Sequence, residues 1–310
     1  MGDLPRWIKA DAAYSDVQRT VDRTFLFKPT EEVRQIIGAS AGRALKKYPV
    51  KLFWLDFNIN HKQNGIAPLS DDPEHIQNVA GFHQMFNSLV ALRINQLYER
   101  EGAVFSSRNR STEAVDDWSL EQQLLYAVTN PSKDGLVDRV AHWKGFSSYK
   151  QLATGEVERF YYVDWTAWHR AGGKKSKKKP QNFLKRVEVR LSPIPSWEHM
   201  SESKRQAYFR KEVRKLEQKY RLEREKEGRT AMGKRKLEKI DPRDRPKTPA
   251  VKTRKPLCHA ATKAAADEYK EQLKAFLEQF YYASGMWQRG HRDVEFPRGS
   301  FRPPDIRAAV

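Results

Sequence analysis

The first part of the chain alternates short apolar runs with longer segments of helical periodicity. Residues 24–27 (TFLF) predict a strand, which Pro29 ends. Thr30 then suits the N-cap of a helix that runs to about residue 47. The run VKLFWLDF at 50–57 predicts a second strand, and turn residues at 58–60 lead into a third that ends near residue 67. The second and third strands are expected to form a hairpin in the middle of a sheet.

Two more helices and an intervening strand follow. Apolar positions recur at helical spacing over residues 73–100, and residues 104–115 have the length for one or two short strands. Residues 118–130 predict another helix, which Pro131 is expected to end. The order strand, helix, strand, strand, helix, strand, helix predicts an α+β fold, with a ferredoxin-like or RRM-like antiparallel sheet and helices on one face.

After about residue 149 the pattern becomes more polar and more basic. RFYYVDWTAW and NFLKRVEVRL predict a β-hairpin around the tip AGGKKSKKKPQ. A charged helix over 201–227, an extended Pro-rich basic stretch and a helix over 262–282 are expected to follow. These patterns divide the chain into an N-terminal arm (1–22), a body (23–152) and a basic C-terminal extension (153–310).

The charge balance indicates a polyanionic partner. The 310 residues include 58 Lys and Arg against 39 Asp and Glu, a formal net charge of +19. Nucleic acid is the natural partner for such an excess, although ribosomal and membrane-surface proteins can carry the same charge. The single cysteine, Cys258, excludes an internal disulfide framework and a multi-thiolate zinc site. Because neither a secretory signal nor an apolar membrane span is recognisable, we expect a cytoplasmic, nucleoid-associated protein without a membrane partner.

Two pairs of residues have a spacing that suits chemistry. His61 and Gln63 are two apart on a predicted strand, so they point to one face of the sheet. Tyr126 and Asn130 are four apart on a predicted helix and share one side of it. The more frequent fates of such residues are a strand-edge histidine, a solvated glutamine and a core tyrosine before a helix-ending Asn-Pro. Spacing alone does not separate these alternatives.

The order of these segments resembles that of the REP-associated tyrosine transposases, a branch of the single-tyrosine HUH family. The resemblance extends over about residues 23–151 and rests on RTFLFKPTEEVRQII, NHKQ and LLYAVTNPSKDGLVDRVAHWKGFSSY. The last segment has the family's tyrosine, the asparagine four residues later, the Pro, the Gly-Leu-Val, the Trp and the Ser-rich end. The matching residues are Tyr126, Asn130, Pro131, Gly135, Leu136, Val137, Trp143, Ser147 and Ser148.

The resemblance implies a transposase that cuts and rejoins single-stranded or hairpin DNA. Tyr126 would be the nucleophile, forming a 5′-phosphotyrosine, and a divalent Mg or Mn ion would be held by His61, Gln63 and Asn130. Gln63 stands where the family has a second histidine. A glutamine oxygen can still ligate Mg²⁺ or Mn²⁺, which favour oxygen donors.

The basic residues expected to contact DNA lie in three segments of the sequence. They are Lys62, Arg108, Arg110, Lys174, Lys175, Lys177, Lys178 and Lys179. Two alternatives stay open: a catalytically degenerate protein that binds hairpin DNA, and an RRM-like RNA-binding protein, which the missing RNP-type aromatic run disfavours. The sequence does not decide between a monomer and a homodimer.

Overall fold

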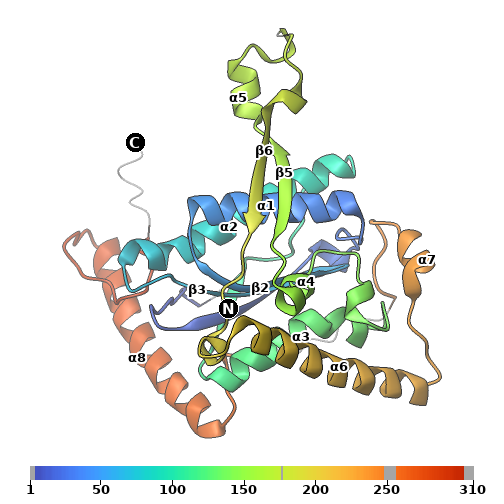
Figure 1. Cartoon of the computed structure of the whole chain (residues 1–310). Coiled ribbons are helices and arrows are strands. Elements are labelled where there is room, and N and C mark those ends of the chain that lie inside the picture. The colour runs from blue at the N-terminus through green and yellow to red at the C-terminus, as the bar shows by residue number, and fades with distance from the viewer. Residues whose placement is uncertain (1–3, 176, 248–255, 304–310) are drawn as a thin grey trace.

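The computed structural model describes residues 4–175, 177–247 and 256–303, and its centre is a mixed sheet (Figure 1). The five strands are ordered β2-β3-β1-β4-β7. Their bounds are β1 (Ala13–Arg19), β2 (Lys51–Asn58), β3 (His61–Ala67), β4 (Arg110–Ala114) and β7 (Cys258–His259). The pairs β2/β3, β3/β1 and β1/β4 are antiparallel, and β7 runs parallel to β4. An α+β fold dominated by antiparallel pairing is therefore confirmed.

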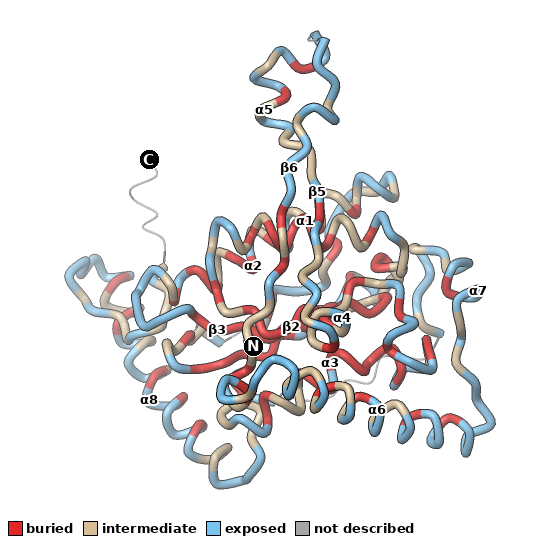
Figure 2. Tube along the Cα trace, viewed as in Figure 1, coloured by how far each residue is buried: buried red, intermediate tan, exposed pale blue. Residues whose placement is uncertain are grey.

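Helices cover both faces of this sheet, so the expectation of helices on one face is wrong. Helices α1 (Glu31–Lys47) and α2 (Pro73–Leu97) lie on one face, where Ile37 and Phe82 pack against Leu55 of β2. Helices α3 (Asp117–Lys133) and α6 (Glu202–Lys226) lie on the other, where Leu124 and Phe209 belong to a separate buried cluster (Figures 1 and 2). Two apolar layers thus enclose the middle of the sheet.

The first strand is not where the apolar run predicted it. Residues 24–27 form no strand. Leu26 and Phe27 are buried, and the N–H of Phe27 donates one isolated hydrogen bond to the carbonyl of Ile59. The strand β1 instead comes from residues 13–19, within the segment assigned to an N-terminal arm, and pairs on both sides. Its inward side chains include Asp16 and Gln18, so it lacks the apolar alternation that marks a half-buried strand.

The bounds of α1, α2 and α6 agree with the sequence to within three residues, whereas α8 (Lys263–Gln288) extends beyond the expected end at residue 282 and α3 continues past Pro131. Thr30 caps α1 by accepting a hydrogen bond from the N–H of Val33 at 3.4 Å. Pro131 lies inside α3, which continues to Lys133. The proline has no N–H to donate to the carbonyl of Ala127, yet the N–H of Asp134 still closes on the carbonyl of Asn130 at 2.8 Å. Asn130 therefore keeps a helical position relative to the preceding turn.

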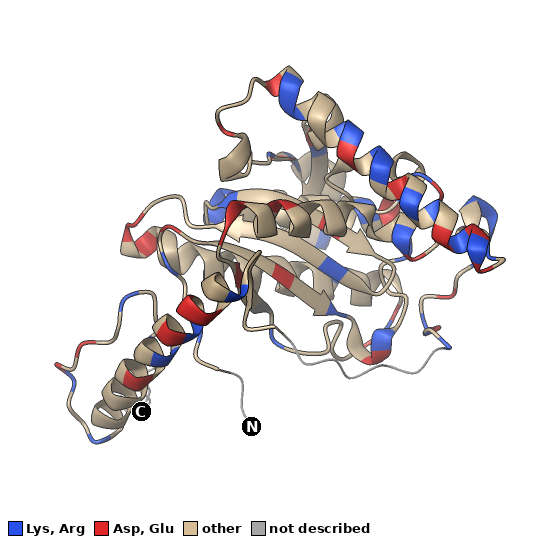
Figure 3. Cartoon of the chain, turned by 90° about the horizontal axis from the view of Figure 1, so that it is seen from below, with Lys and Arg blue, Asp and Glu red and all other residues tan. Residues whose placement is uncertain are grey.

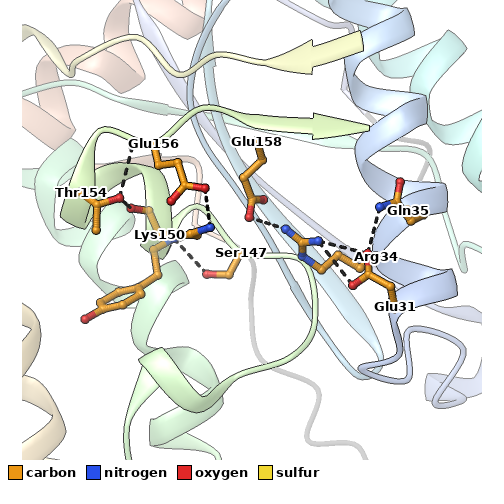
Figure 4. Close-up of polar contacts among 9 residues, drawn as sticks. Glu31, Arg34, Gln35, Ser147, Lys150, Thr154, Glu156 and Glu158 are labelled. Carbon is orange, nitrogen blue, oxygen red and sulfur yellow. Dashed lines mark hydrogen bonds and ion pairs between the residues drawn. The ribbon is translucent and has the colours of Figure 1, made fainter. Parts of the chain in front are cut away.

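The predicted basic hairpin is confirmed, and it rises from the α1 side of the molecule (Figure 1). It consists of β5 (Glu158–Val163) and β6 (Leu184–Val189), with α5 (Trp165–Arg170) near its tip. Gly38 of α1 leaves room for the Phe160 ring, because a Cβ there would overlap it. Arg34 of α1 is ion-paired with Glu158, and its neighbour Glu31 lies 3.4 Å away (Figure 4). The base of the hairpin is thereby fixed to the body.

The remaining elements surround the body. They are α4 (Tyr149–Thr154), α7 (Gly233–Glu238), α8 (Lys263–Gln288) and the short 3-10 helices Val21–Arg23, Val140–His142, Gly173–Lys175, Pro180–Phe183 and Pro195–Trp197. Acidic and basic residues are interleaved along α6 (Figure 3). Its buried Arg224 pairs with Asp138 at 2.9 Å and donates to the carbonyl of Ser132, which ties α6 to the end of α3. In the parts of the chain described, no helix has both the length and the apolar character to span a membrane.

A buried polar cluster lies between the sheet and α2. The carboxylate of Asp16 lies 2.8 Å from Nε2 of His83 and accepts from the amide of Asn64 at 2.9 Å. The ammonium of Lys62 is 3.4 Å from Oδ1 of Asn64 and 5.1 Å from the centre of the Phe86 ring. Lys62 has 0% of its surface exposed, so the expectation that it contacts DNA is wrong.

Burial lowers the pKa of Lys62 to about 8, although the charge of Asp16 opposes this shift. For Asp16, burial opposes ionisation, but His83 and Lys62 outweigh it and lower the pKa of its carboxyl. The lowered pKa of Lys62 means that the unfolded chain binds more protons than the folded one between pH 8 and its ordinary value of 10.5. The contribution of this side chain to stability is therefore largest above that range and falls as the pH drops towards 8.

We predict that Lys62→Met removes this pH dependence. The free energy of unfolding of the unsubstituted protein, minus that of the variant, should rise by on the order of 3 kcal/mol between pH 8 and pH 10.5. Urea unfolding at several pH values measures it. Lys185→Met, at an exposed position of β6, is the matched control and should show no such rise. A flat difference for Lys62→Met would contradict a deprotonating buried amine.

Candidate active site

Strand β3 directs His61 and Gln63 to the face that α3 covers. His61 is opposite Asn58 of β2 and Arg19 of β1, and Gln63 is opposite Asp56 and Val17. Side chains that are directly opposed in a sheet point to the same face. Arg19 and Val17 are exposed there, whereas Gln63 is mostly buried. An open strip of sheet therefore borders α3.

The hydrogen bonds of His61 define its protonation state. Its Nδ1 lies 2.8 Å from Oδ1 of Asn60, and because a carboxamide oxygen only accepts, Nδ1 carries the proton. Nε2 then accepts from Nδ2 of Asn130 at 2.7 Å. Burial, followed by the charge of Arg19, lowers the pKa of His61 to about 4. At neutral pH the ring is an uncharged imidazole whose Nε2 lone pair points towards α3 and accepts from Asn130.

Helix α3 contributes an amide and a phenol. Asn130 is 3% exposed, while Tyr126, one turn earlier, is 37% exposed. The ammonium of Lys133 lies 4.3 Å from the centre of the Tyr126 ring. Helical spacing places Tyr126 on the same side of α3 as Asn130, and Asn130 touches His61. The phenol therefore lies at the solvent-exposed border of the site.

Of the four residues expected in the site, two are in direct contact, and the other two lie on the same strand face or helix side as one of that pair. His61 and Asn130 are in contact across a sequence separation of 69 residues. Gln63 shares the face of β3 with His61, and Tyr126 shares the side of α3 with Asn130. Among the residues described, neither the Gln63 amide nor the Tyr126 hydroxyl has a hydrogen-bond partner. Both groups are therefore available to a ligand.

The fit of a divalent ion depends on oxygen donors. Adjacent ligands of an octahedral ion bound at about 2.1 Å lie about 3.0 Å apart. The 2.7 Å separation of His61 Nε2 and the Asn130 amide is close to that value, provided that the amide turns to present Oδ1. Within the described residues no group of three or more His, Cys, Asp or Glu could hold a metal. The amide oxygens of Asn130 and Gln63 would have to complete the set.

Sequence reasoning missed the groups that support this contact. Arg19 was overlooked because β1 was assigned to an arm, and Asn60 was interpreted only as a turn residue. Asn58 donates to Oδ2 of Asp134 at 2.7 Å, which joins the end of β2 to the end of α3 beside the His61–Asn130 contact. The signal for Asn58 and Asn60 is the NIN turn itself, since both amides precede the histidine by a few residues.

The basic residues expected to contact DNA lie outside this site. Lys174, Lys175, Lys177, Lys178 and Lys179 are exposed near the tip of the β5–β6 hairpin, on the opposite side of the sheet from α3 (Figure 1). Arg108 is exposed just before β4. Arg110 begins β4, and its side chain lies outside what the structure describes. These residues could contact a polymer that extends beyond the site, and do not contribute to its chemistry.

Comparison with known proteins gives little further information. No protein-family model matches the chain, and no curated protein matches it. Among solved structures, one of a REP-associated tyrosine transposase bound to a REP hairpin is similar to this chain. The alignment covers 50% of this chain and 87% of the transposase chain, at 17% identity and a TM-score of 0.38. A likeness at this level does not establish a shared fold.

Proposed function

We propose that this protein cuts and rejoins single-stranded or hairpin DNA, with Tyr126 as the nucleophile. The observation that carries the proposal is the 2.7 Å contact between His61 Nε2 and the Asn130 amide, one turn from the half-exposed phenol. This contact links two of the three sequence segments on which the resemblance to single-tyrosine HUH transposases rests, NHKQ and LLYAVTNPSKDGLVDRVAHWKGFSSY. A core tyrosine, the more frequent fate of such a residue, would not be 37% exposed beside that pair.

The strand order agrees with the fold that such an enzyme needs. Without β7 the sheet is ordered β2-β3-β1-β4, and α1 connects β1 to β2 while α2 connects β3 to β4. Because β3 is antiparallel to both of its neighbours, β1 and β2 are mutually parallel. Two such β-α-β crossovers favour the ferredoxin-like interpretation. Helix α3 then covers the face that α1 and α2 leave free.

The chain's own residues supply most of the chemistry. The Tyr126 oxygen would form a bond to phosphorus as the bond from phosphorus to the 3′ oxygen breaks, and the phenolic proton would pass to solvent. The 3′ oxygen would take up a proton and remain as a hydroxyl that can attack the phosphotyrosine for rejoining. Lys133 and Arg19 place positive charge on either side of the site, where it would stabilise the phosphorane-like transition state.

A divalent metal would complete this arrangement. His61, Gln63 and Asn130 would hold Mg²⁺ or Mn²⁺, and the bound ion would polarise the scissile phosphate as a Lewis acid. Asn60 holds the imidazole in the tautomer whose Nε2 is unprotonated. The low pKa of His61, about 4, keeps Nε2 unprotonated throughout the physiological pH range, so that it could ligate an ion once the Asn130 amide turns.

The basic extension would hold the DNA. The net charge of +19 is the excess that remains after every Asp and Glu is counted, and the exposed lysines near the tip of the β5–β6 hairpin carry part of it. Lysines that neutralise phosphates release condensed counterions, so this contact would be sequence-independent and weakened by salt.

We predict that Tyr126→Phe abolishes a covalent DNA adduct. The unsubstituted protein, mixed with Mn²⁺ and a labelled single-stranded hairpin oligonucleotide, should give a band that survives denaturing electrophoresis. The variant should give none, because a phenyl ring has no oxygen to attack phosphorus. Tyr281→Phe, which removes another exposed phenol, on α8, is the matched control and should retain the band. An adduct on the Tyr126→Phe protein would show that another residue is the nucleophile.

The second candidate function is hairpin binding by a catalytically degenerate protein. Gln63 favours it, because the amide replaces the second histidine of the family and leaves His61 as the one imidazole of the set. Both candidate functions require binding of hairpin DNA. They differ in whether the metal site supports cleavage.

We predict that Gln63→His increases the rate of adduct formation by about tenfold, because it restores the second histidine of the metal site that the resemblance implies. Gln63→Ala is the matched control and should lower the rate. The measurement is the initial rate at limiting Mn²⁺. If the unsubstituted protein binds the hairpin without forming an adduct and only Gln63→His forms one, the degenerate binder is the correct function.

A further inference from the structure

A small cavity lies on the other face of the sheet, near the start of β4. It has a volume of about 180 Å³ and is bordered by the N-terminal segment 4–7, by residues 108, 109 and 111, and by α8. Ser111 is opposite Asp16, whose carboxylate is on the α2 side of the sheet, so the cavity is separate from the His61 site. Nothing in the proposed strand cleavage uses it.

The cavity carries positive charge. Arg6 is half-buried in its wall and donates to the carbonyl of Asn109 at 3.3 Å, and Arg108 is exposed beside it. Burial, followed by the charge of Arg108, lowers the pKa of Arg6, while Asp16 opposes the shift. That carboxylate already contacts His83 and Asn64. The two guanidinium groups therefore leave charge that an anion can neutralise.

The cavity wall also contains an unpaired amide. Asn109 is 5% exposed, and neither its Oδ1 nor its Nδ2 has a hydrogen-bond partner in the described part of the chain. Buried polar atoms are nearly always paired, and an orphaned amide is costly unless a ligand completes it. An amide offers one acceptor and two donors, which can match the edge of a nucleobase.

Two aromatic residues, Trp7 and Tyr269, border the same cavity. Trp7 stacks on Phe276 of α8, with ring centres 4.7 Å apart and planes inclined by 12°, and the Lys9 ammonium lies 4.8 Å from the centre of the Trp7 ring and 5.4 Å from that of Tyr269. The volume is below the roughly 300 Å³ at which pockets for drug-sized ligands begin. A single planar ring with an attached anion fits this combination better than a whole cofactor does.

We propose that this cavity binds one unpaired nucleotide of single-stranded DNA. The base lies against Trp7 and Tyr269 with its edge on the Asn109 amide, and its phosphate pairs with Arg6 and Arg108. The inference rests on the proposed function only in taking DNA as the ligand. The cavity is at β4, two strand spacings or about 10 Å from β3, so one strand that passes the sheet edge can reach both sites.

The test is an abasic scan with the full chain. Labelled single-stranded oligonucleotides, each lacking one base, are titrated and followed by fluorescence anisotropy. For the unsubstituted protein, loss of the base at one position should weaken binding by about tenfold, the order expected for one stacked base. Asn109→Ala should remove that position's effect. Arg108→Gln, at an exposed site where folding is not at risk, should weaken binding of the intact strand and of the abasic strand alike, because an abasic nucleotide keeps its phosphate.

Arg159→Gln on β5 is the matched control, because it removes one exposed arginine elsewhere and should leave the scan unchanged. The inference is overturned if the Asn109→Ala protein gives the same scan as the unsubstituted protein, or if Arg108→Gln leaves the affinity for the intact strand unchanged. It is also overturned if inorganic phosphate alone competes as well as a deoxynucleoside monophosphate does. Adduct formation at Tyr126 is scored separately. An adduct with no Asn109-dependent position defeats this inference alone, whereas an Asn109-dependent position without an adduct defeats only the cleavage proposal.

Discussion

The register of β3 between β1 and β2 is the constraint on which both sides of this molecule depend. Successive residues of a strand point to opposite faces, so His61 and Gln63 face α3 while Lys62 and Asn64 face α2. A slip by one residue would bury the imidazole beside Asp16 and expose the lysine to α3. The buried Asp16–His83–Asn64–Lys62 cluster makes such a slip costly, because it would leave these polar groups without their partners. A structural cluster on one face thus holds the chemical groups of the other in place.

Most of the fold could be predicted from the chain because its strongest patterns are local. Thr30 before two glutamates, the apolar run of β2 and the long periodicity of α2 each identify one element without reference to the rest. The first strand escaped detection because its buried side chains are polar and find their partners in α2 and β3. The apolar run at 24–27 was therefore predicted to be the first strand. Its backbone N–H groups instead make single hydrogen bonds to separate segments of the chain. The placement of α3 opposite α1 and α2 depends on tertiary packing, which helical periodicity does not encode.

The candidate site was predictable to a similar extent. The spacings of His61 with Gln63 and of Tyr126 with Asn130 put each pair on one face, but only the folded chain brings the two pairs to the same place. Arg19 and Lys133 could not be identified in advance, because their roles come from register and from the side on which α3 packs. For Lys62 the sequence pointed to the wrong role. A lysine in a basic chain was expected to lie on the surface and contact DNA, but the pleat of β3 turns its side chain into the interior. The exposed lysines of the hairpin lie far from this chemistry, so the proposed function assigns DNA affinity and DNA cleavage to different parts of the molecule.

The central claim is that His61 and Asn130 act as one site, and a double-mutant cycle on Mn²⁺ affinity tests it most directly. The affinity would be measured for the unsubstituted protein, for His61→Ala, for Asn130→Ala and for the double variant, by electron paramagnetic resonance of free Mn²⁺. Because both residues are held to contribute to one ion, the double variant should bind Mn²⁺ about as weakly as the weaker single variant does. Strictly additive losses, or an affinity that neither substitution changes, would contradict the account.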